Sequence, residues 1–305
     1  MTKSCWRVLW LLMSMPCVLS CARVQAAPKA AAAKVSRSPS IRLIVRGDDL
    51  GALHGIDAGA EKAFTQGIMT VAHVIVPGPW FPEAVRLLNA HPEVDVGIHL
   101  AITSEWSNVK WRPLTHAPSL VDDDGFFRPF IWPNKSLPGA SHKEAGTWKL
   151  EEIEAELRAQ IELIKKRLPR VSNGGCHMGC DSLDPKVRDL IVRLLREYKL
   201  TPDRTNLKHL PIEHPKDRAG NTLTWQEREA ALIKALETVG PGDYEIGEHP
   251  ATDDPEMRAI SHPGYENVAE DRAAVMAVWT SAKVKEVIAR RGIALIGFRD
   301  LPKQK

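Results

Sequence analysis

Residues 41–51 read IRLIVRGDDLG, a run of branched apolar residues that ends at two adjacent carboxylates. The run at 41–45 predicts a buried strand, because short continuous apolar segments bounded by glycine are typical of strands covered on both faces. Helical spacing follows, and the two patterns then alternate along the chain. Such alternation is typical of parallel strands joined by helical crossovers, so the sequence predicts an α/β fold.

The other elements continue this alternation over residues 41–305, which we interpret as a single domain. Further strands are predicted at 69–76, 94–100, 244–247 and 293–298, with a short segment at 171–179. Helices are predicted at 56–64, 82–90, 148–168, 184–198, 225–239 and 268–291. Residues 101–146 carry turn signals but little periodicity and are expected to form a long inserted loop. Periodicity alone leaves open a barrel, a distorted barrel and an open doubly wound sheet.

The first 40 residues are predicted to be a targeting signal and a tether. Residues 1–20 combine two basic residues with a short apolar run, which is typical of a secretory signal peptide. Residues 18–21 (VLSC) resemble a bacterial lipobox, in which Cys21 would carry a lipid; cleavage after Ala26 and an uncleaved N-terminus are the alternatives. Residues 21–40 have the composition of a linker. The protein is therefore expected to be exported, either to the periplasm or as a membrane-anchored lipoprotein.

Composition limits the possible function classes. The chain has 305 residues, of which 44% are hydrophobic, so it is globular rather than disordered or collagen-like. Lys and Arg number 41 against 38 Asp and Glu, a formal net charge of +3. Nucleic acids and anionic lipid surfaces are bound by clustered positive charge, so neither is the expected partner.

Four polar segments follow short apolar runs. They are Asp48 and Asp49, then His99, His177 and His249. Active sites of α/β barrels and open sheets lie at the carboxyl ends of the strands, so these side chains are expected to meet at one mouth.

One carboxylate and two imidazoles suit a divalent metal of the zinc type and leave a position for water. A second carboxylate beside the first is then available as a general base, and a further histidine as a general acid. Adjacent residues of an extended strand face opposite ways, but Gly47 and Gly51 give this segment the freedom to turn both aspartates inward. Taken singly, each residue also has a structural explanation: a helix cap or turn for the aspartates, a core position for His99, a loop for His177 and a turn for His249.

The chain resembles the YdjC-like carbohydrate deacetylases, which include the chitooligosaccharide deacetylases. Residues 44–51 (IVRGDDLG) and 94–100 (VDVGIHL) carry the resemblance. Weaker matches are 67–70, 76–79, 104–106 with 111–114, 177–179, 249–250 and 271–272.

The resemblance implies a distorted (β/α) barrel and metal-dependent removal of N-acetyl groups from a carbohydrate. Asp49, His99 and His177 would hold the metal, Asp48 would be the base and His249 the acid. His262 is the reserve candidate for the acid. Trp106, Trp111 and Arg272 would contact the substrate, although the tryptophans could equally pin the loop that carries them. The expected cofactor is one divalent ion, zinc in the first place, with magnesium, manganese or cobalt as alternatives.

The chain departs from the family pattern just before His177. Asn173 stands where the family often has a histidine, and Gly175 where it has an aspartate. Cys176 and Cys180 flank the histidine. In an extended strand their Cα atoms would be about 13 Å apart, too far for a disulfide, but Gly179 permits a tight turn. A disulfide, two free thiols and a thiolate ligand all remain open.

The sequence thus predicts an exported, metal-dependent carbohydrate deacetylase whose substrate is a small molecule or an oligosaccharide. A catalytically degenerate glycan-binding lipoprotein and another mononuclear metallohydrolase are the alternatives. A homodimer is a further possibility.

Overall fold

The computed structural model describes residues 40–203, 207–212 and 223–302. Every element named below lies in the unit Ser38–Lys305. The predicted signal peptide, the lipid anchor at Cys21 and nearly all of the linker lie outside the described residues, so these assignments stay predictions. Among the described residues, no helix combines the length and apolar character that crossing a membrane requires.

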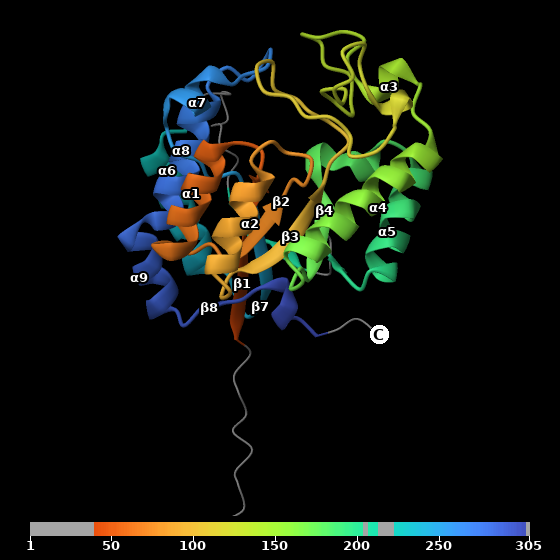
Figure 1. Cartoon of the computed structure of the whole chain (residues 1–305). Coiled ribbons are helices and arrows are strands. Elements are labelled where there is room, and N and C mark those ends of the chain that lie inside the picture. The colour runs from red at the N-terminus through yellow and green to blue at the C-terminus, as the bar shows by residue number, and fades with distance from the viewer. Residues whose placement is uncertain (1–39, 204–206, 213–222, 303–305) are drawn as a thin grey trace, which may run out of the picture. The chain divides into compact units, whose positions relative to one another are not determined.

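A parallel sheet forms the centre of the fold (Figure 1). Its strands are β1 (Ile41–Leu50), β2 (Val71–Val74), β3 (Asp95–Leu100), β4 (Asn173–Cys176), β5 (Thr201–Pro202), β6 (Lys208–His209), β7 (Gly242–Glu248) and β8 (Ala294–Leu295). Neighbouring strands pair in the order β5-β4-β3-β2-β1-β7-β6, and β8 also pairs with β1. Because β5 and β6 end this order without pairing to each other, the sheet is a half-barrel rather than a closed one.

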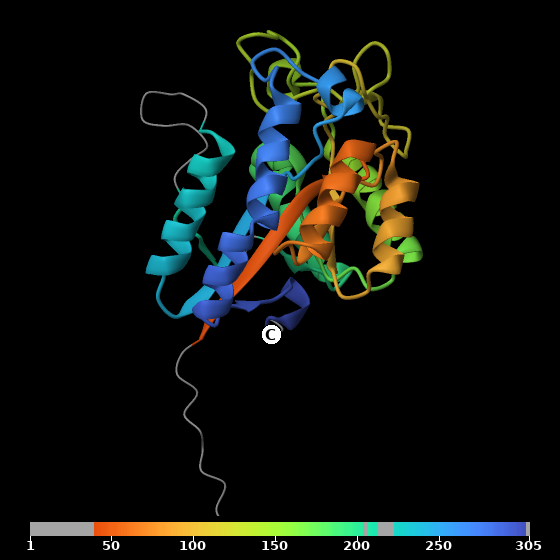
Figure 2. The ribbon, with the colours of Figure 1, turned by 90° about the vertical axis from the view of Figure 1, so that its left-hand side faces the viewer.

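Helices cover the outside of the sheet, as Figures 1 and 2 show. They are α1 (His54–Thr65), α2 (Phe81–Ala90), α3 (His142–Ala145), α4 (Leu150–Arg167), α5 (Pro185–Glu197), α6 (Trp225–Thr238), α7 (Pro255–Ala259), α8 (Val268–Thr280) and α9 (Ala282–Arg290). Three short 3₁₀ helices are η1 (Pro118–Leu120), η2 (His177–Ser182) and η3 (Phe298–Asp300). The α/β architecture and the distorted-barrel prediction are confirmed.

One predicted helix was wrong. Residues 268–291 form two helices, α8 and α9, which meet at Ser281. The backbone of Ser281 is extended, with ψ of 131°, and its hydroxyl accepts the N–H groups of Lys283 and Val284. A serine in this role caps a new helix, so the apolar spacing on either side does not belong to one element.

The long insertion at 101–146 is anchored to the barrel at its start. Ala101 exchanges two hydrogen bonds with the Gln160 side chain of α4, and His142 Nε2 lies 2.7 Å from the carbonyl oxygen of Ile102. In both views the insertion covers the end of the molecule toward which the strands point (Figures 1 and 2). The polar strand ends therefore lie beneath an ordered cover.

Candidate active site

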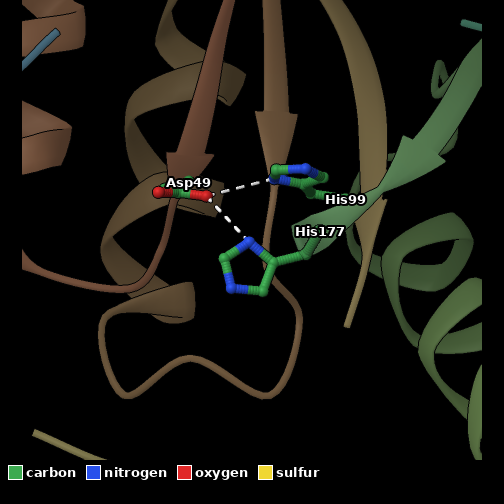
Figure 3. Close-up of side chains that lie close together, drawn as sticks. All are labelled: Asp49, His99 and His177. Carbon is green, nitrogen blue, oxygen red and sulfur yellow. Dashed lines mark ion pairs between the residues drawn. The ribbon is translucent and has the colours of Figure 1, made fainter. Parts of the chain in front are cut away.

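Three of the predicted side chains meet at the carboxyl ends of their strands (Figure 3). Asp49 lies near the end of β1, His99 near the end of β3, and His177 directly after β4. Nδ1 of each histidine is 3.2 Å from Oδ1 of Asp49. One ligand atom from each residue lies within 4.8 Å of the others, and all three residues are buried.

A backbone irregularity in β1 brings both aspartates to this end. Asp49 is left-handed, with φ of 71°, and the pairing of β1 with β2 shifts register between Gly47 and Leu50. A bulge of this kind re-aims a side chain that a regular strand would send to the opposite face. As a result Asp48 and Asp49 both line the same cavity.

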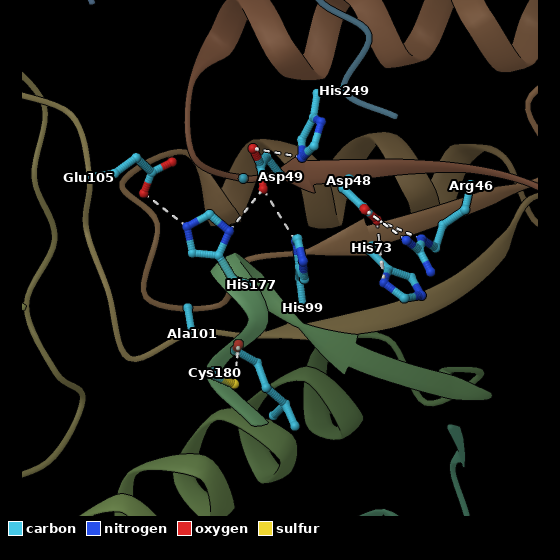
Figure 4. A network of polar contacts seen from close by, with 12 residues as sticks. Arg46, Asp48, Asp49, His73, His99, Ala101, Glu105, His177, Cys180 and His249 are labelled. Carbon is cyan, nitrogen blue, oxygen red and sulfur yellow. Dashed lines mark hydrogen bonds and ion pairs between the residues drawn. The ribbon is translucent and has the colours of Figure 1, made fainter. Parts of the chain in front are cut away.

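Asp48 is held by a cation and a histidine behind it (Figure 4). Its Oδ1 is 2.9 Å from Nε of Arg46, and its Oδ2 accepts a 3.1 Å hydrogen bond from the same guanidinium. Nδ1 of His73 is 3.4 Å from Oδ1. Burial opposes the charge on Asp48, but Arg46, assisted by the histidines, lowers the pKa of this carboxyl to about 2. Asp48 is therefore an anion at neutral pH, as a general base must be.

The two departures from the family pattern both have a place in this arrangement. Asn173 is buried, and its Oδ1 lies 2.6 Å from Nε2 of His73. Its amide nitrogen is 2.9 Å from the Ser172 hydroxyl, which fixes the amide orientation. A Cβ on Gly175 would be 2.0 Å from Oδ2 of Asp203, so the Asp203 carboxylate fills that space.

Asp203 in turn pairs with Arg46 at 3.1 Å, so Arg46 bridges Asp203 and Asp48. A carboxylate is thus present beside Gly175, although it comes from the residue after β5 rather than from β4. Arg46, His73 and Asp203 were not predicted as site residues. Arg46 had a usable signal, since it lies two residues before Asp48, and such residues share a face of a strand. Asp203 had none.

His177 lies between two carboxylates. Nδ1 faces Asp49, and Nε2 is 2.9 Å from Oε2 of Glu105, which lies in the insertion. Burial disfavours an imidazolium here, but Glu105 and Asp49 outweigh it and raise the pKa of His177 to about 10. Glu105 belongs to a segment that resembles the family, yet no role was predicted for it.

His249 and Arg272 approach Asp49 from the other side. Nε2 of His249 is 3.7 Å from Oδ2 of Asp49, and the Arg272 guanidinium is 2.9 Å from the same oxygen. The side chain of His249 is 39% exposed, so it reaches the open part of the cavity. Its pKa is lowered, chiefly by desolvation, with Arg272 contributing and Asp49 opposing.

The cavity at this mouth has a volume of about 350 Å³. The predicted base, acid and metal ligands all line it, together with Glu105, Trp106, Cys176, Met178, His262, Tyr265 and Arg272.

The predicted tryptophans differ in position. Trp106 lines the cavity but is only 1% exposed, and its ring stacks on His262 with 5.6 Å between centroids. Trp111 is buried against His177 and is not part of the lining. The burial of both favours the alternative in which they hold the insertion in place. Arg272 lines the cavity. Its predicted contact with substrate stays a prediction.

The donor set fits a divalent metal. Both Asp49 oxygens and Nδ1 of His99 are buried, and within the described part of the chain none of them has a hydrogen bond of normal geometry. Buried polar atoms rarely lack such a partner. A carboxylate with two imidazoles is a common ligand set of mononuclear hydrolytic sites and leaves positions for water and substrate.

Cys176 and Cys180 are free thiols. The chain turns tightly between them, since Met178 and Gly179 are both left-handed, and Sγ of Cys180 lies 3.5 Å from the carbonyl oxygen of Leu100. The sequence left open a disulfide, two free thiols and a thiolate ligand. In the structure the two cysteines are not linked to each other.

With the site in view, comparison with known proteins places the chain. The profile of a family described as YdjC-like protein matches residues 42–290. The chain belongs to the YdjC-like family. The resemblance predicted from the sequence motifs is therefore confirmed.

Relatives within this YdjC-like family are named as deacetylases. A carbohydrate deacetylase of Geobacillus stearothermophilus is 30% identical over 267 residues, covering 85% of this chain and 98% of the relative. A carbohydrate deacetylase of Brevibacillus brevis is 25% identical, covering 86% and 100%. A chitooligosaccharide deacetylase of Yersinia pestis is 27% identical, covering 85% and 98%. The names of these relatives support the interpretation of this chain as a deacetylase.

A solved structure shares the fold of this YdjC-like protein. It is described as a proposed cellobiose-phosphate cleavage protein of Enterococcus faecalis, with a TM-score of 0.66 and 24% identity. The match covers 85% of this chain and 98% of the other. At this identity the likeness supports the fold alone.

Proposed function

We propose that this YdjC-like protein is a metal-dependent hydrolase that removes N-acetyl groups from a carbohydrate. The observation that carries the proposal is the meeting of buried ligand atoms from Asp49, His99 and His177, with the anion of Asp48 beside them. The relatives named as carbohydrate and chitooligosaccharide deacetylases support the substrate class.

In this proposal Asp49, His99 and His177 hold one divalent metal, zinc in the first place. Such an ion would polarise the amide carbonyl and acidify a water molecule. Asp48 takes a proton from the water as its oxygen attacks the carbonyl carbon. Arg46 keeps Asp48 anionic until that moment. When the C–N bond breaks, His249 gives its proton to the departing amine, and acetate and a free amino sugar remain.

The lowered pKa of His249 has a consequence for this scheme. It makes the imidazolium a stronger acid but reduces the protonated fraction at neutral pH. As pH rises, activity is therefore expected to decline when His249 loses its proton. This decline should occur at a lower pH than the one at which an ordinary histidine titrates.

Replacement of Asp48 by asparagine tests the assignment of the base. Asp48→Asn should retain the metal, because Asp48 is not a ligand, and should lower kcat by about 10²–10⁴-fold, the usual contribution of a general base. The measurements are metal content and acetate release from N-acetylated sugars.

Asp123→Asn, which changes an exposed carboxylate of the insertion, is the matched control. Acetate release by Asp48→Asn at the parent rate would refute the role of Asp48. A parent protein that binds sugar, binds no metal and releases no acetate would instead establish the alternative of a degenerate glycan-binding protein.

A further inference from the structure

His177 has a carboxylate at each end of its imidazole ring. Oδ1 of Asp49 is 3.2 Å from Nδ1, and Oε2 of Glu105 is 2.9 Å from Nε2 (Figure 4). Both side chains of the second pair are 3% exposed. The short distance and the burial make this contact a charge-assisted hydrogen bond rather than a loose surface pair.

The chemistry of the ring assigns different roles to its two nitrogens. A metal that binds an imidazole displaces one proton and leaves one N–H, and the hydrogen bond made by one nitrogen decides which nitrogen is free to bind the metal. Nδ1 points toward Asp49 and His99, the other members of the proposed metal site. Nε2 must then carry the hydrogen, and Glu105 is the acceptor placed to receive it.

We propose that Glu105 is a positioning residue, which holds the Nε2–H form of His177 so that Nδ1 is presented to a divalent metal. The proposal rests on the proposed function in that it takes the Asp49–His99–His177 site to bind a metal.

Glu105 is not positioned to be a metal ligand itself, because it lies on the far side of the His177 ring. It contacts the ring edge opposite to the one that faces Asp49, and the group of atoms able to share one ion contains Asp49, His99 and His177 without it. Its carboxylate thus acts on the metal through His177.

The backbone on both sides of Glu105 is fixed. Ser104 donates its N–H to the carbonyl oxygen of Arg128, and its hydroxyl accepts the N–H of Trp111. Ser107 donates its N–H to the carbonyl oxygen of Ser261. A side chain on such a support stays within hydrogen-bond reach of its partner, as a group that orients a ligand must.

Burial of this carboxylate needs a reason. Removing a carboxylate from water costs several kcal/mol unless the charge is compensated. Within the part of the chain that the structure describes, the ion pair with His177 is the one that Glu105 makes. Orientation of a metal ligand accounts for a charge kept at this position, since such partners typically change metal affinity 10–100-fold.

The test is the affinity of the metal-free protein for Co²⁺ and Zn²⁺, measured by competition with a chelator. Glu105→Gln should weaken both affinities by about 10–100-fold and alter the visible spectrum of the Co²⁺ form. If the glutamine variant does not fold, Glu105→Asp serves instead and should also weaken binding, because its shorter side chain withdraws the carboxylate from Nε2.

Glu156→Gln is the matched control. Glu156 is also a buried carboxylate that supports the insertion, through the backbone N–H groups of Leu114 and Thr115, but it has no contact with His177. It should leave the Co²⁺ spectrum unchanged. In addition, Glu105→Gln should have no further effect on metal affinity in a His177→Ala background, because two residues that act through one contact are not additive.

The outcomes separate the two proposals. Parent-like affinity and spectrum in Glu105→Gln would overturn the role of Glu105 while leaving the deacetylase proposal intact. An equal loss in Glu156→Gln would also overturn it, since the effect would then come from the loop as a whole. Failure of the parent itself to bind Co²⁺ or Zn²⁺ would overturn the proposed function and this inference with it.

Discussion

Arg46 determines the chemical state of the proposed base. It contacts both oxygens of Asp48 and also pairs with Asp203, so its single charge is shared between two carboxylates. Asp48, the proposed base, and Asp49, a proposed metal ligand, were predictable as site residues because they lie near the end of a strand. Their supporting residue Asp203 was not, because its role depends on which strand lies beside Gly175.

Replacing Arg46 should move the acidic limit of activity. In Arg46→Gln the carboxyl of Asp48 loses the cation that holds its pKa near 2, so the pKa rises. The base is then protonated at a higher pH, and the acidic limb of a kcat/KM profile shifts upward. Arg42→Gln is the control, because Arg42 forms a comparable pair with Asp243 at the far end of β1. An unshifted limb in Arg46→Gln would contradict the role of Arg46.

At the scale of elements, the α/β alternation predicted the principal strands and helices. It did not predict the places where these elements are interrupted. The break between α8 and α9 depends on the cap at Ser281, and the bulge in β1 on one left-handed residue. The two-residue strands β5 and β6 are too short to carry a pattern of their own. Periodicity reports a repeated environment, so it cannot register features that occupy one or two residues.

The first turn of α1 contains a buried acid, Asp57, whose stability effect has a definite sign. Oδ1 of Asp57 accepts the N–H of Gly51 at 2.7 Å, and burial raises the pKa of Asp57 to about 8. Between roughly pH 4 and 8 the folded state therefore keeps a proton that the unfolded chain releases. The contribution of Asp57 to the free energy of unfolding is present at low pH and decreases as pH rises through this window.

Asp57→Asn should remove this dependence. The difference in unfolding free energy between parent and variant should change with pH, by up to about 1.4 kcal/mol per pH unit within the window. Urea denaturation at several pH values measures it. Glu61→Gln, an exposed change on the same helix, is the control. A constant difference for Asp57→Asn would show that Asp57 keeps an ordinary pKa.

For the whole molecule, the direction of parallel strands explains why the meeting of the three proposed metal ligands could be predicted at all. Asp49, His99 and His177 are far apart in sequence, but parallel strands bring their carboxyl ends to one edge. That rule says nothing of the cover above the edge. Glu105 belongs to the insertion, whose path is set by particular hydrogen bonds to α4 and to residue 261.

The ion pair between Arg272 and Asp49 has a consequence for how a metal would enter the proposed site. In the unfolded chain this ion pair has not yet formed, so the three proposed ligands are free of it. A metal that arrives during folding competes with no cation, whereas one that arrives afterwards must displace a buried guanidinium. We therefore expect loading during refolding with Zn²⁺ to be faster than loading of the folded, metal-free protein. Arg272→Gln should reduce that difference, and equal rates in the parent would show that Arg272 is no barrier. If loading is faster during refolding, the timing of metal supply decides how much active protein a cell obtains.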